Sequence, residues 1–240
     1  MSEKNYVISI GGHLLHRGAK SKEELNIKNY EMYAEVIKKI KKRINAGIVV
    51  VCGGGDICRE EMKRAKEMGI KDNVELDMIG IKWTHINAEM LGNAIGEEAT
   101  IHKKTESEMK EILKNLENGK IPVCGGEKPG HSTDFDAALI AKSIKETGKD
   151  VVFIDARKYP LYDKDPALFK DAKKLDKISS EKLFELARGS KQDPGTYQID
   201  LGAIEIIHKF KIKTIFIDGF TDPEEIVRAV EGQHSGTEIV

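Results

Sequence analysis

Cysteine and long apolar runs are both scarce in this chain of 240 residues. The three cysteines, Cys52, Cys58 and Cys124, are odd in number and scattered, which argues against a disulfide framework or a zinc site. Cys52 and Cys124 lie in apolar segments and are expected to be core residues. No apolar run approaches the roughly 20 residues of a membrane span, and the N-terminus is too polar for a signal peptide. We therefore expect a cytoplasmic protein with no membrane partner.

A charge excess of either sign is also absent, since 39 basic residues stand against 40 acidic ones. This balance gives no reason to expect a nucleic-acid polymer or an anionic membrane as a partner. Internal repeats, low-complexity tracts and flexible linkers are absent too, so we expect a single domain over residues 1–240. A division of that domain into two lobes near residue 150 stays open at this point.

Short apolar segments alternate with amphipathic ones along the chain. Strands are predicted at residues 6–10, 47–52, 121–124, 151–154 and 214–217. Helices are predicted at residues 29–45, 56–68, 75–95 and 105–116, and after Thr133. Strands separated by helices predict an α/β fold with a parallel sheet that is covered on both faces.

Two of the predicted helices carry more detailed signals. Within 75–95, apolar residues recur at helical spacing and are expected to form its buried face: Ile79, Trp83, Ile86 and Met90. At the start of 105–116, Thr105 and Glu108 match a capping box. Two polar segments are expected to be loops, 18–28 and the charged, proline-containing 155–178, and long loops are often functional.

Glycine clusters follow the apolar runs at three places: Gly11 with Gly12, the run Gly53, Gly54 and Gly55, and the segment PGHSTDFDAALIA at 129–141. A helix start offers unpaired N–H groups and a partial positive charge, which suits an anionic ligand. Three such junctions indicate an enzyme that handles phosphate, although the GxxxxGK[ST] phosphate loop is absent.

Seven ordered blocks resemble the amino acid kinase family and, within it, the archaeal-type UMP kinases. The blocks are ISIGGHLL, VVVCGGGDICRE, LDMIGIKWTHINAEML, IPVCGGEKPGHSTDFDAALIA, YDKDP, GTYQIDLGAIEII and GQHSGTEIV, which together span essentially the whole chain. The resemblance implies a three-layer α/β/α sandwich around a mostly parallel sheet of about eight strands. It also implies transfer of the γ-phosphoryl group of ATP to UMP, giving UDP, with Mg²⁺ held mostly by nucleotide phosphates and water, so that no metal ligand of the protein is predicted. By the same resemblance, residues 1–150 bind the acceptor, residues 151–240 bind ATP, and the chain forms a homohexamer.

The resemblance assigns acceptor-side roles to glycines that approach the phosphate, an arginine that binds it, a ribose-binding aspartate, a helix threonine and two hydroxyls at the uracil edge. These residues are Gly11, Gly12, Gly53, Gly54, Gly55, Arg59, Asp77, Thr84, Ser132 and Thr133. Structural alternatives stay open for several of them. Arg59 can be a solvated helix arginine, and Ser132 or Thr133 can cap the following helix. In the same region, Asn87 can make a helix–helix hydrogen bond, and Trp83 is expected to serve in packing.

Asp134 and Asp200 are the expected catalytic carboxylates, because phosphoryl transfer depends on positioning and charge neutralisation. Asp200 can equally be the N-cap of the helix that follows it. On the ATP side, the resemblance assigns Arg157, Tyr162, Asp165 and Pro166 to nucleotide binding.

The chain departs from the family pattern at three places. Tyr159 and Pro160 replace an Asp-Gly turn, Ser9 stands where many members have a catalytic lysine, and His13 stands where serine or glutamate is common. Proline cannot reproduce a glycine that needs a positive φ or a free N–H. Two alternative functions therefore stay open: a related kinase with another small acceptor, its pocket altered by His13, Trp83 and His85, and an ATP-binding storage protein for molybdate or tungstate.

Overall fold

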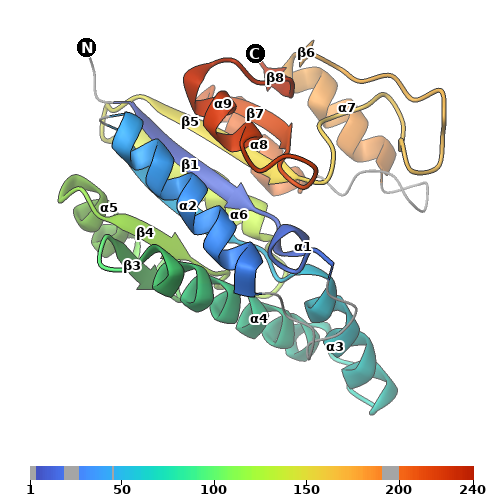
Figure 1. The fold of residues 1–240 in the computed structure, drawn as a ribbon. Helices are drawn as coiled ribbons and strands as arrows, with labels where there is room; N and C mark the ends of the chain where they lie inside the picture. The colour runs from blue at the N-terminus through green and yellow to red at the C-terminus, as the bar shows by residue number, and fades with distance from the viewer. Residues whose placement is uncertain (1–3, 19–26, 45, 191–199) are drawn as a thin grey trace.

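The computed structural model describes residues 4–18, 27–44, 46–190 and 200–240. Eight strands form one sheet in the order β3-β4-β2-β1-β5-β7-β8-β6 (Figure 1). The strands are β1 (Asn5–Ile10), β2 (Gly47–Cys52), β3 (Ala99–His102), β4 (Ile121–Cys124), β5 (Val151–Arg157), β6 (Lys177–Ile178), β7 (Lys213–Asp218) and β8 (Thr237–Ile239). All neighbours pair in parallel except β7 and β8. The predicted mostly parallel sheet is confirmed.

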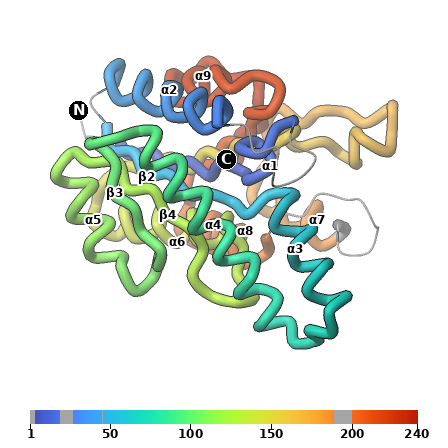
Figure 2. The backbone as a smooth tube through the Cα atoms, turned by 60° about the horizontal axis from the view of Figure 1, so that its bottom comes forward, coloured from blue at the N-terminus to red at the C-terminus, as the bar shows by residue number. Residues whose placement is uncertain are grey.

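Nine helices of the described residues surround this sheet: α1 (Gly12–Leu15), α2 (Ile27–Arg43), α3 (Gly55–Glu67), α4 (Asn73–Ile95), α5 (Met109–Glu117), α6 (Thr133–Glu146), α7 (Ser180–Ser190), α8 (Leu201–Phe210) and α9 (Glu225–Glu231). Successive strand residues face opposite sides, so Ile8 joins a core cluster with α2, α4 and α9, whereas Val7 joins one with α5, α6, α7 and α8. Figure 2 shows α2 and α9 on one side of the sheet and α6 and α8 on the other. Cys52 and Cys124 lie in these cores as predicted.

The buried face of α4 differs from the predicted one. Ile86 is 39% exposed, and the rest of the predicted stripe is only half-buried. The residues that face the interior are instead Leu76, Gly80, Ile81, Thr84, Asn87, Ala88, Leu91, Gly92 and Ile95. Polar and small residues occupy this face because they make tertiary hydrogen bonds or allow close approach. Hydrophobic periodicity therefore selects the wrong side of the helix.

The capping box at Thr105 and Glu108 is also wrong. Helix α5 begins at Met109, and Glu108 makes no capping hydrogen bond. The Thr105 hydroxyl donates to the carbonyl of Gly125 at 3.0 Å, and the Glu108 carboxylate lies 3.0 Å from His102 Nδ1. Both side chains are engaged by the ends of β3 and β4, so neither is available to cap the helix.

The two predicted loops are partly confirmed. Most of 18–28 lies outside the described residues, and its last two residues already belong to α2. In the second segment, β5 continues to Arg157 and β6 begins at Lys177, which leaves a long loop between them. The first five residues of the GTYQID block lie outside the described residues as well. The short strands β3, β6 and β8 were not predicted, because two to four residues carry little periodicity.

Candidate active site

The carboxyl ends of β1, β2 and β5 meet at one edge of the sheet. Ile10 is in register with Cys52 on one side and with Ala156 on the other. The segments that follow these strands, together with the start of α6, line a cleft of about 730 Å³. Ligands of parallel α/β folds bind at this edge. The predicted site residues that the structure brings together here are Gly11, Gly12, Gly53, Gly54, Gly55, Arg59, Thr133, Asp134, Arg157 and Asp165.

The two glycine segments cross each other closely at the floor of the cleft. A Cβ atom on Gly12 would lie 2.3 Å from the Gly55 nitrogen and 2.4 Å from the Gly53 carbonyl oxygen. Gly55 also has a φ of 77°, which side-chain-bearing residues rarely adopt. The backbone therefore forms a surface without side chains, against which a phosphoryl group can lie close to N–H groups.

A buried hydrogen-bond network under the floor holds this crossing in place. Asn87 donates from Nδ2 to the Gly53 carbonyl at 2.6 Å, and its Oδ1 accepts from the Tyr30 hydroxyl at 2.7 Å. His16 Nε2 lies 2.9 Å from the same Oδ1 atom. The helix–helix contact expected for Asn87 is therefore present through Tyr30, but the contact with the glycine loop was not predicted. Trp83 is half-buried and packs edge-on against His16, with ring centroids 6.3 Å apart.

The start of α6 brings Thr133 and Asp134 to the cleft. Ser132 is the N-cap of this helix, and its hydroxyl accepts a hydrogen bond from the Phe135 N–H at 3.1 Å. The Asp134 carboxylate accepts from the Ser9 hydroxyl at 2.9 Å and pairs with Arg157 at 3.3 Å. Of the two hydroxyl residues expected at the uracil edge, Ser132 caps the helix instead, and only Thr133 lines the cleft.

A buried carboxylate stands behind Arg157. The Arg157 guanidinium lies 2.6 Å from the Asp155 carboxylate, and both residues belong to the end of β5. Burial raises the pKa of Asp155 to about 7, against the pull of Arg157 in the opposite direction, and the nearby Asp134 raises it further. Sequence reasoning missed Asp155. Its signal was a single carboxylate at the carboxyl end of an apolar strand.

The cleft holds three cations and four aspartates around a neutral imidazole. Burial lowers the pKa of His13 to about 4, Asp56 opposes this shift, and Arg59, Arg157 and Lys158 reinforce it. His13 is therefore uncharged at neutral pH, while the three cations face the same space. Arg59 forms an ion pair with Asp56, but both side chains are about two-thirds exposed. Such a surface pair is weak, so Arg59 can exchange Asp56 for an anionic ligand.

Three predicted site residues do not line the cleft but accept hydrogen bonds from backbone N–H groups of the segment that precedes α6. Asp77 accepts a hydrogen bond from the Gly130 N–H at 2.7 Å, and Thr84 accepts one from the Gly126 N–H at 2.7 Å. Asp200 is the N-cap of α8, accepting from the Ala203 N–H at 3.1 Å, and it also accepts from the Ser132 N–H at 3.3 Å. The Asp200 carboxylate thereby joins the starts of α6 and α8.

The loop after β5 supplies the opposite wall. Lys158 lies over the rings of both Tyr159 and Phe220, at 5.3 and 5.9 Å from their centroids. Tyr162 is not in the lining; it bridges to Lys174 and packs against Tyr159. Pro166 is also outside the lining, next to Asp165 within it. His13, expected in the pocket only for the alternative acceptor, lines the cleft. The residues that line it without having been predicted are Asp56, Asp155, Ala156, Lys158, Tyr159, Ala167 and Phe220.

Two further histidines have structural contacts near the cleft. His85 Nε2 lies 2.8 Å from the Gly126 carbonyl oxygen, and the His131 ring stacks on Phe135 with centroids 4.1 Å apart. Neither belongs to the lining of the cleft.

The fold and the cleft define a phosphoryl-binding α/β protein: glycine segments and cations converge where parallel strands end. The sequence profile named "Amino acid kinase family" matches residues 4–218, and the chain belongs to that family. Within the described residues, no helix has both the length and the apolar character needed to cross a bilayer.

Relatives of known name match over almost their whole length. The chain is 32% identical to the uridylate kinase of Methanobrevibacter smithii, covering 98% of each chain, and 36% identical to that of Methanocaldococcus jannaschii, covering 96% of this chain and 97% of the other. The crystal structure of uridylate kinase from Archaeoglobus fulgidus superposes with a TM-score of 0.80 at 34% identity and full coverage of both chains. UMP kinase from Bacillus anthracis gives 0.79 at 25% identity, covering all of this chain and 96% of the other.

Proposed function

We propose that the protein transfers the γ-phosphoryl group of ATP to UMP, giving ADP and UDP. The observation that carries this proposal is the crossing of Gly12 with the 53–55 glycine loop, faced by Arg59 and Arg157 in one cleft. The relatives named uridylate kinase and UMP kinase supply the identity of the acceptor.

The acceptor is assigned to the half formed by residues 1–150. The N–H groups of the 53–55 loop and the Arg59 guanidinium are placed to hold its phosphate, since guanidinium binds phosphate in a bidentate manner. Thr133, with a hydroxyl in the lining, is assigned to the uracil edge. Asp77 and Ser132 act by shaping the turn that precedes α6.

ATP is assigned to the half formed by residues 151–240. Arg157, Lys158 and Asp165 face the cleft from this side, and the rings of Tyr159 and Phe220 offer flat surfaces for a base. In the loop after β5, where Tyr159 and Pro160 replace the Asp-Gly turn of the family pattern, other contacts hold the backbone. Pro160 is buried, and the Leu161 N–H donates to the Thr237 hydroxyl at 3.0 Å. Tyr162 and Pro166 help to maintain this loop.

The chemistry follows from charge and position. The phosphate of UMP is already ionised at neutral pH, so transfer requires no strong general base. Its barrier comes from bringing two anions together, which the cations of the cleft counteract. We assign this role to Arg157, which reaches the cleft from β5 on the strand next to Ser9. Asp134 and Asp155 orient the guanidinium, and Asp200 acts as a positioning residue through the start of α6.

Mg²⁺ belongs to this proposal as an ion that accompanies ATP. The carboxylates of Asp134 and Asp165 in the lining are suitable oxygen ligands, and nucleotide oxygens and water complete the coordination. The ion neutralises charge on the transferred group. Assembly as a homohexamer rests on the family resemblance alone, and action in the cytoplasm rests on the sequence features given above.

A coupled assay of ADP release with UMP, CMP and other small phosphorylated acceptors tests the function. We expect UMP to be the preferred acceptor. Arg59→Gln should raise KM for UMP by about 10- to 100-fold, because a charged hydrogen bond contributes about 1.5–3 kcal/mol. Arg64→Gln is the matched control, since Arg64 is ion-paired on the same helix outside the cleft. A preference for another acceptor overturns the substrate assignment, and bound molybdenum or tungsten without ADP release favours the storage function.

A further inference from the structure

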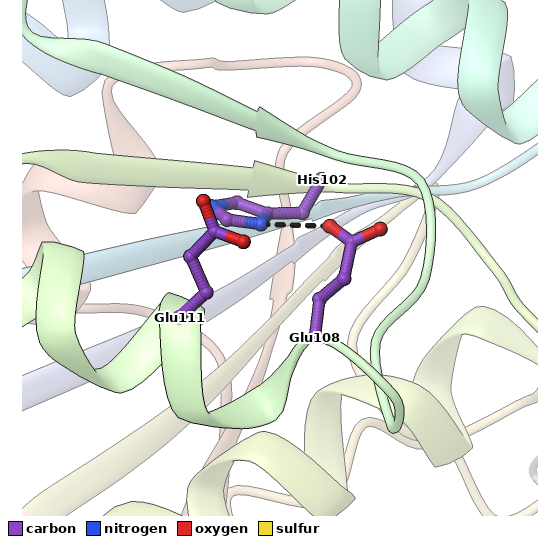
Figure 3. Close-up of side chains that lie close together, drawn as sticks. All are labelled: His102, Glu108 and Glu111. Carbon is purple, nitrogen blue, oxygen red and sulfur yellow. Dashed lines mark hydrogen bonds and ion pairs between the residues drawn. The ribbon is translucent and has the colours of Figure 1, made fainter.

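Three side chains of the kind that bind metal ions gather at the edge of the sheet, apart from the cleft. His102 ends β3, Glu108 precedes α5, and Glu111 lies in the first turn of that helix. One ligand atom from each residue lies within 4.8 Å of the other two. Figure 3 shows both carboxylates directed toward the imidazole. None of these residues lines the proposed active site.

The imidazole is positioned like that of a metal ligand. His102 is only 2% exposed, and its Nδ1 atom lies 3.0 Å from the Glu108 carboxylate. The other nitrogen, Nε2, lies 3.2 Å from the Thr100 hydroxyl and 3.3 Å from the Asn115 amide. Without an ion, the Nδ1–H can donate to the Glu108 carboxylate while Nε2 accepts from the Asn115 amide; a bound ion would take the place of the Nδ1 proton, and Nε2–H would then donate to Thr100. Metal-binding histidines have this arrangement, with the second nitrogen fixed by a hydrogen bond.

The charge of the cluster favours a cation. With a neutral imidazole the three groups carry two negative charges within a short distance, and like charges at that separation repel. Among the described residues, the ion pair of Glu108 is with His102, and no Lys or Arg forms an ion pair with Glu108 or Glu111. The Glu108 side chain is partly exposed and Glu111 is exposed. An ion can therefore reach the site from solvent and keep water in its remaining positions.

We propose that His102, Glu108 and Glu111 bind a divalent transition-metal ion such as Zn²⁺. One nitrogen and two carboxylate oxygens suit Zn²⁺ or Co²⁺, whereas Mg²⁺ prefers oxygen ligands alone. This site is independent of the proposed kinase activity.

The bound ion would stabilise the segment between His102 and Glu108, which contacts the turn at residues 125–127. Between the proposed ligands, the Thr105 hydroxyl donates to the Gly125 carbonyl, and the N–H groups of Glu106 and Ser107 donate to the Glu127 carboxylate. An ion bound by both His102 and Glu108 would link the two ends of the segment between them and restrict its motion. The contacts with the 125–127 turn are thereby stabilised.

Calorimetric titration of the full chain with ZnCl₂ in the absence of nucleotide tests the proposal. We expect one ion bound per chain with an affinity well above that for MgCl₂. His102→Gln and Glu111→Gln should each lower the affinity at least tenfold. Glu117→Gln, which removes an exposed carboxylate from the other end of α5, is the matched control and should bind like the wild type.

Two further measurements make the outcome decisive. Zn²⁺ should raise the melting temperature of the wild type and of Glu117→Gln by similar amounts and that of Glu111→Gln by less. Glu111→Gln changes an exposed side chain and is expected to fold normally. The Co²⁺ complex should lack thiolate charge-transfer absorption, since no cysteine is a proposed ligand. The proposal is overturned if the wild type binds no Zn²⁺, if Glu111→Gln binds it equally well, or if Mg²⁺ is preferred.

Discussion

The Arg157 guanidinium and the Asp155 carboxylate lie 2.6 Å apart at the end of β5, at the inner wall of the proposed active site. The same guanidinium nitrogen lies 3.3 Å from Asp134 on α6. Arg157 is therefore fixed between carboxylates from two elements. This arrangement places a cation beside Ser9, where many family members have a lysine.

Replacing Arg157 with lysine tests this role. Lysine keeps the charge, but its ammonium group is a compact charge on a flexible stem and lacks the planar, preorganised set of donors of the guanidinium. We expect kcat to fall by about 10²- to 10³-fold, the usual effect of removing a group that stabilises transition-state charge. Arg43→Lys, which changes a surface ion pair with Glu231, should leave the kinetics unchanged. Steady-state kinetics with UMP decide the question, and a wild-type kcat in Arg157→Lys would contradict the assignment.

Gly12→Ala should abolish activity through a steric effect. The added Cβ would overlap backbone atoms of Gly53 and Gly55, so the two segments must separate. Gly69→Ala is the control, because Gly69 has a φ of 104° but nothing within 4 Å of the added atom. The control should lose about 1 kcal/mol of stability from backbone strain and keep its activity. Equal activity losses in both variants would show that the close approach of Gly12 is not the cause.

Asn87→Ala should destabilise the protein by about 2–4 kcal/mol. The change leaves the Gly53 carbonyl and the Tyr30 hydroxyl without a partner in a buried site, and each unsatisfied group costs about 1–3 kcal/mol. Asn93→Ala on the same helix removes only an exposed hydrogen bond to Glu89 and should cost less than about 0.5 kcal/mol. Urea unfolding followed by circular dichroism measures both values. Similar costs in the two variants would argue against the buried network as the support of the glycine loop.

Asp136 should make stability depend on pH in an unusual direction. Burial raises its pKa to about 7, Glu127 nearby raises it further, and the Glu127 N–H opposes the shift. Because the folded-state pKa lies above the unfolded value, the stabilisation is present below about pH 4 and is lost as the pH rises to about 7. The free energy of unfolding should therefore fall by about 1.4 kcal/mol per pH unit in this window, relative to Asp136→Asn. Urea unfolding at pH 5 and pH 6.5 tests this, and parallel pH profiles in the two proteins would contradict it.

Sequence reasoning found the local features of this protein because they depend on neighbouring residues. Runs such as GIVVVC are typical of buried parallel strands, and glycine clusters after them mark the ends of those strands. In a parallel sheet the carboxyl ends share one edge, so the glycine clusters at Gly12 and Gly53 could be expected close together without coordinates. Arg157 was assigned to the site by the family resemblance, and it lines the same cleft.

Other features depend on residues far apart in the chain, and only the tertiary structure decides them. Periodicity placed Ile86 on the buried face of α4, but that face is occupied by Asn87, whose partners are Tyr30 and Gly53. Thr105 has the sequence context of a helix cap, yet its hydroxyl donates to the carbonyl of Gly125, which follows β4. A polar side chain takes whichever partner the fold brings near, and the local sequence does not contain that partner.

The sequence by itself determined the α/β fold, the family and the edge of the sheet that carries the site. Alternation of strands and helices and the positions of glycine depend on backbone preferences that act over a few residues. The tertiary structure decided which polar groups meet: Arg157 with Asp155 and Asp134, Asp200 with the start of α6, and His102 with Glu108. These contacts depend on packing between elements, because hydrogen bonds and ion pairs act only over a few ångströms.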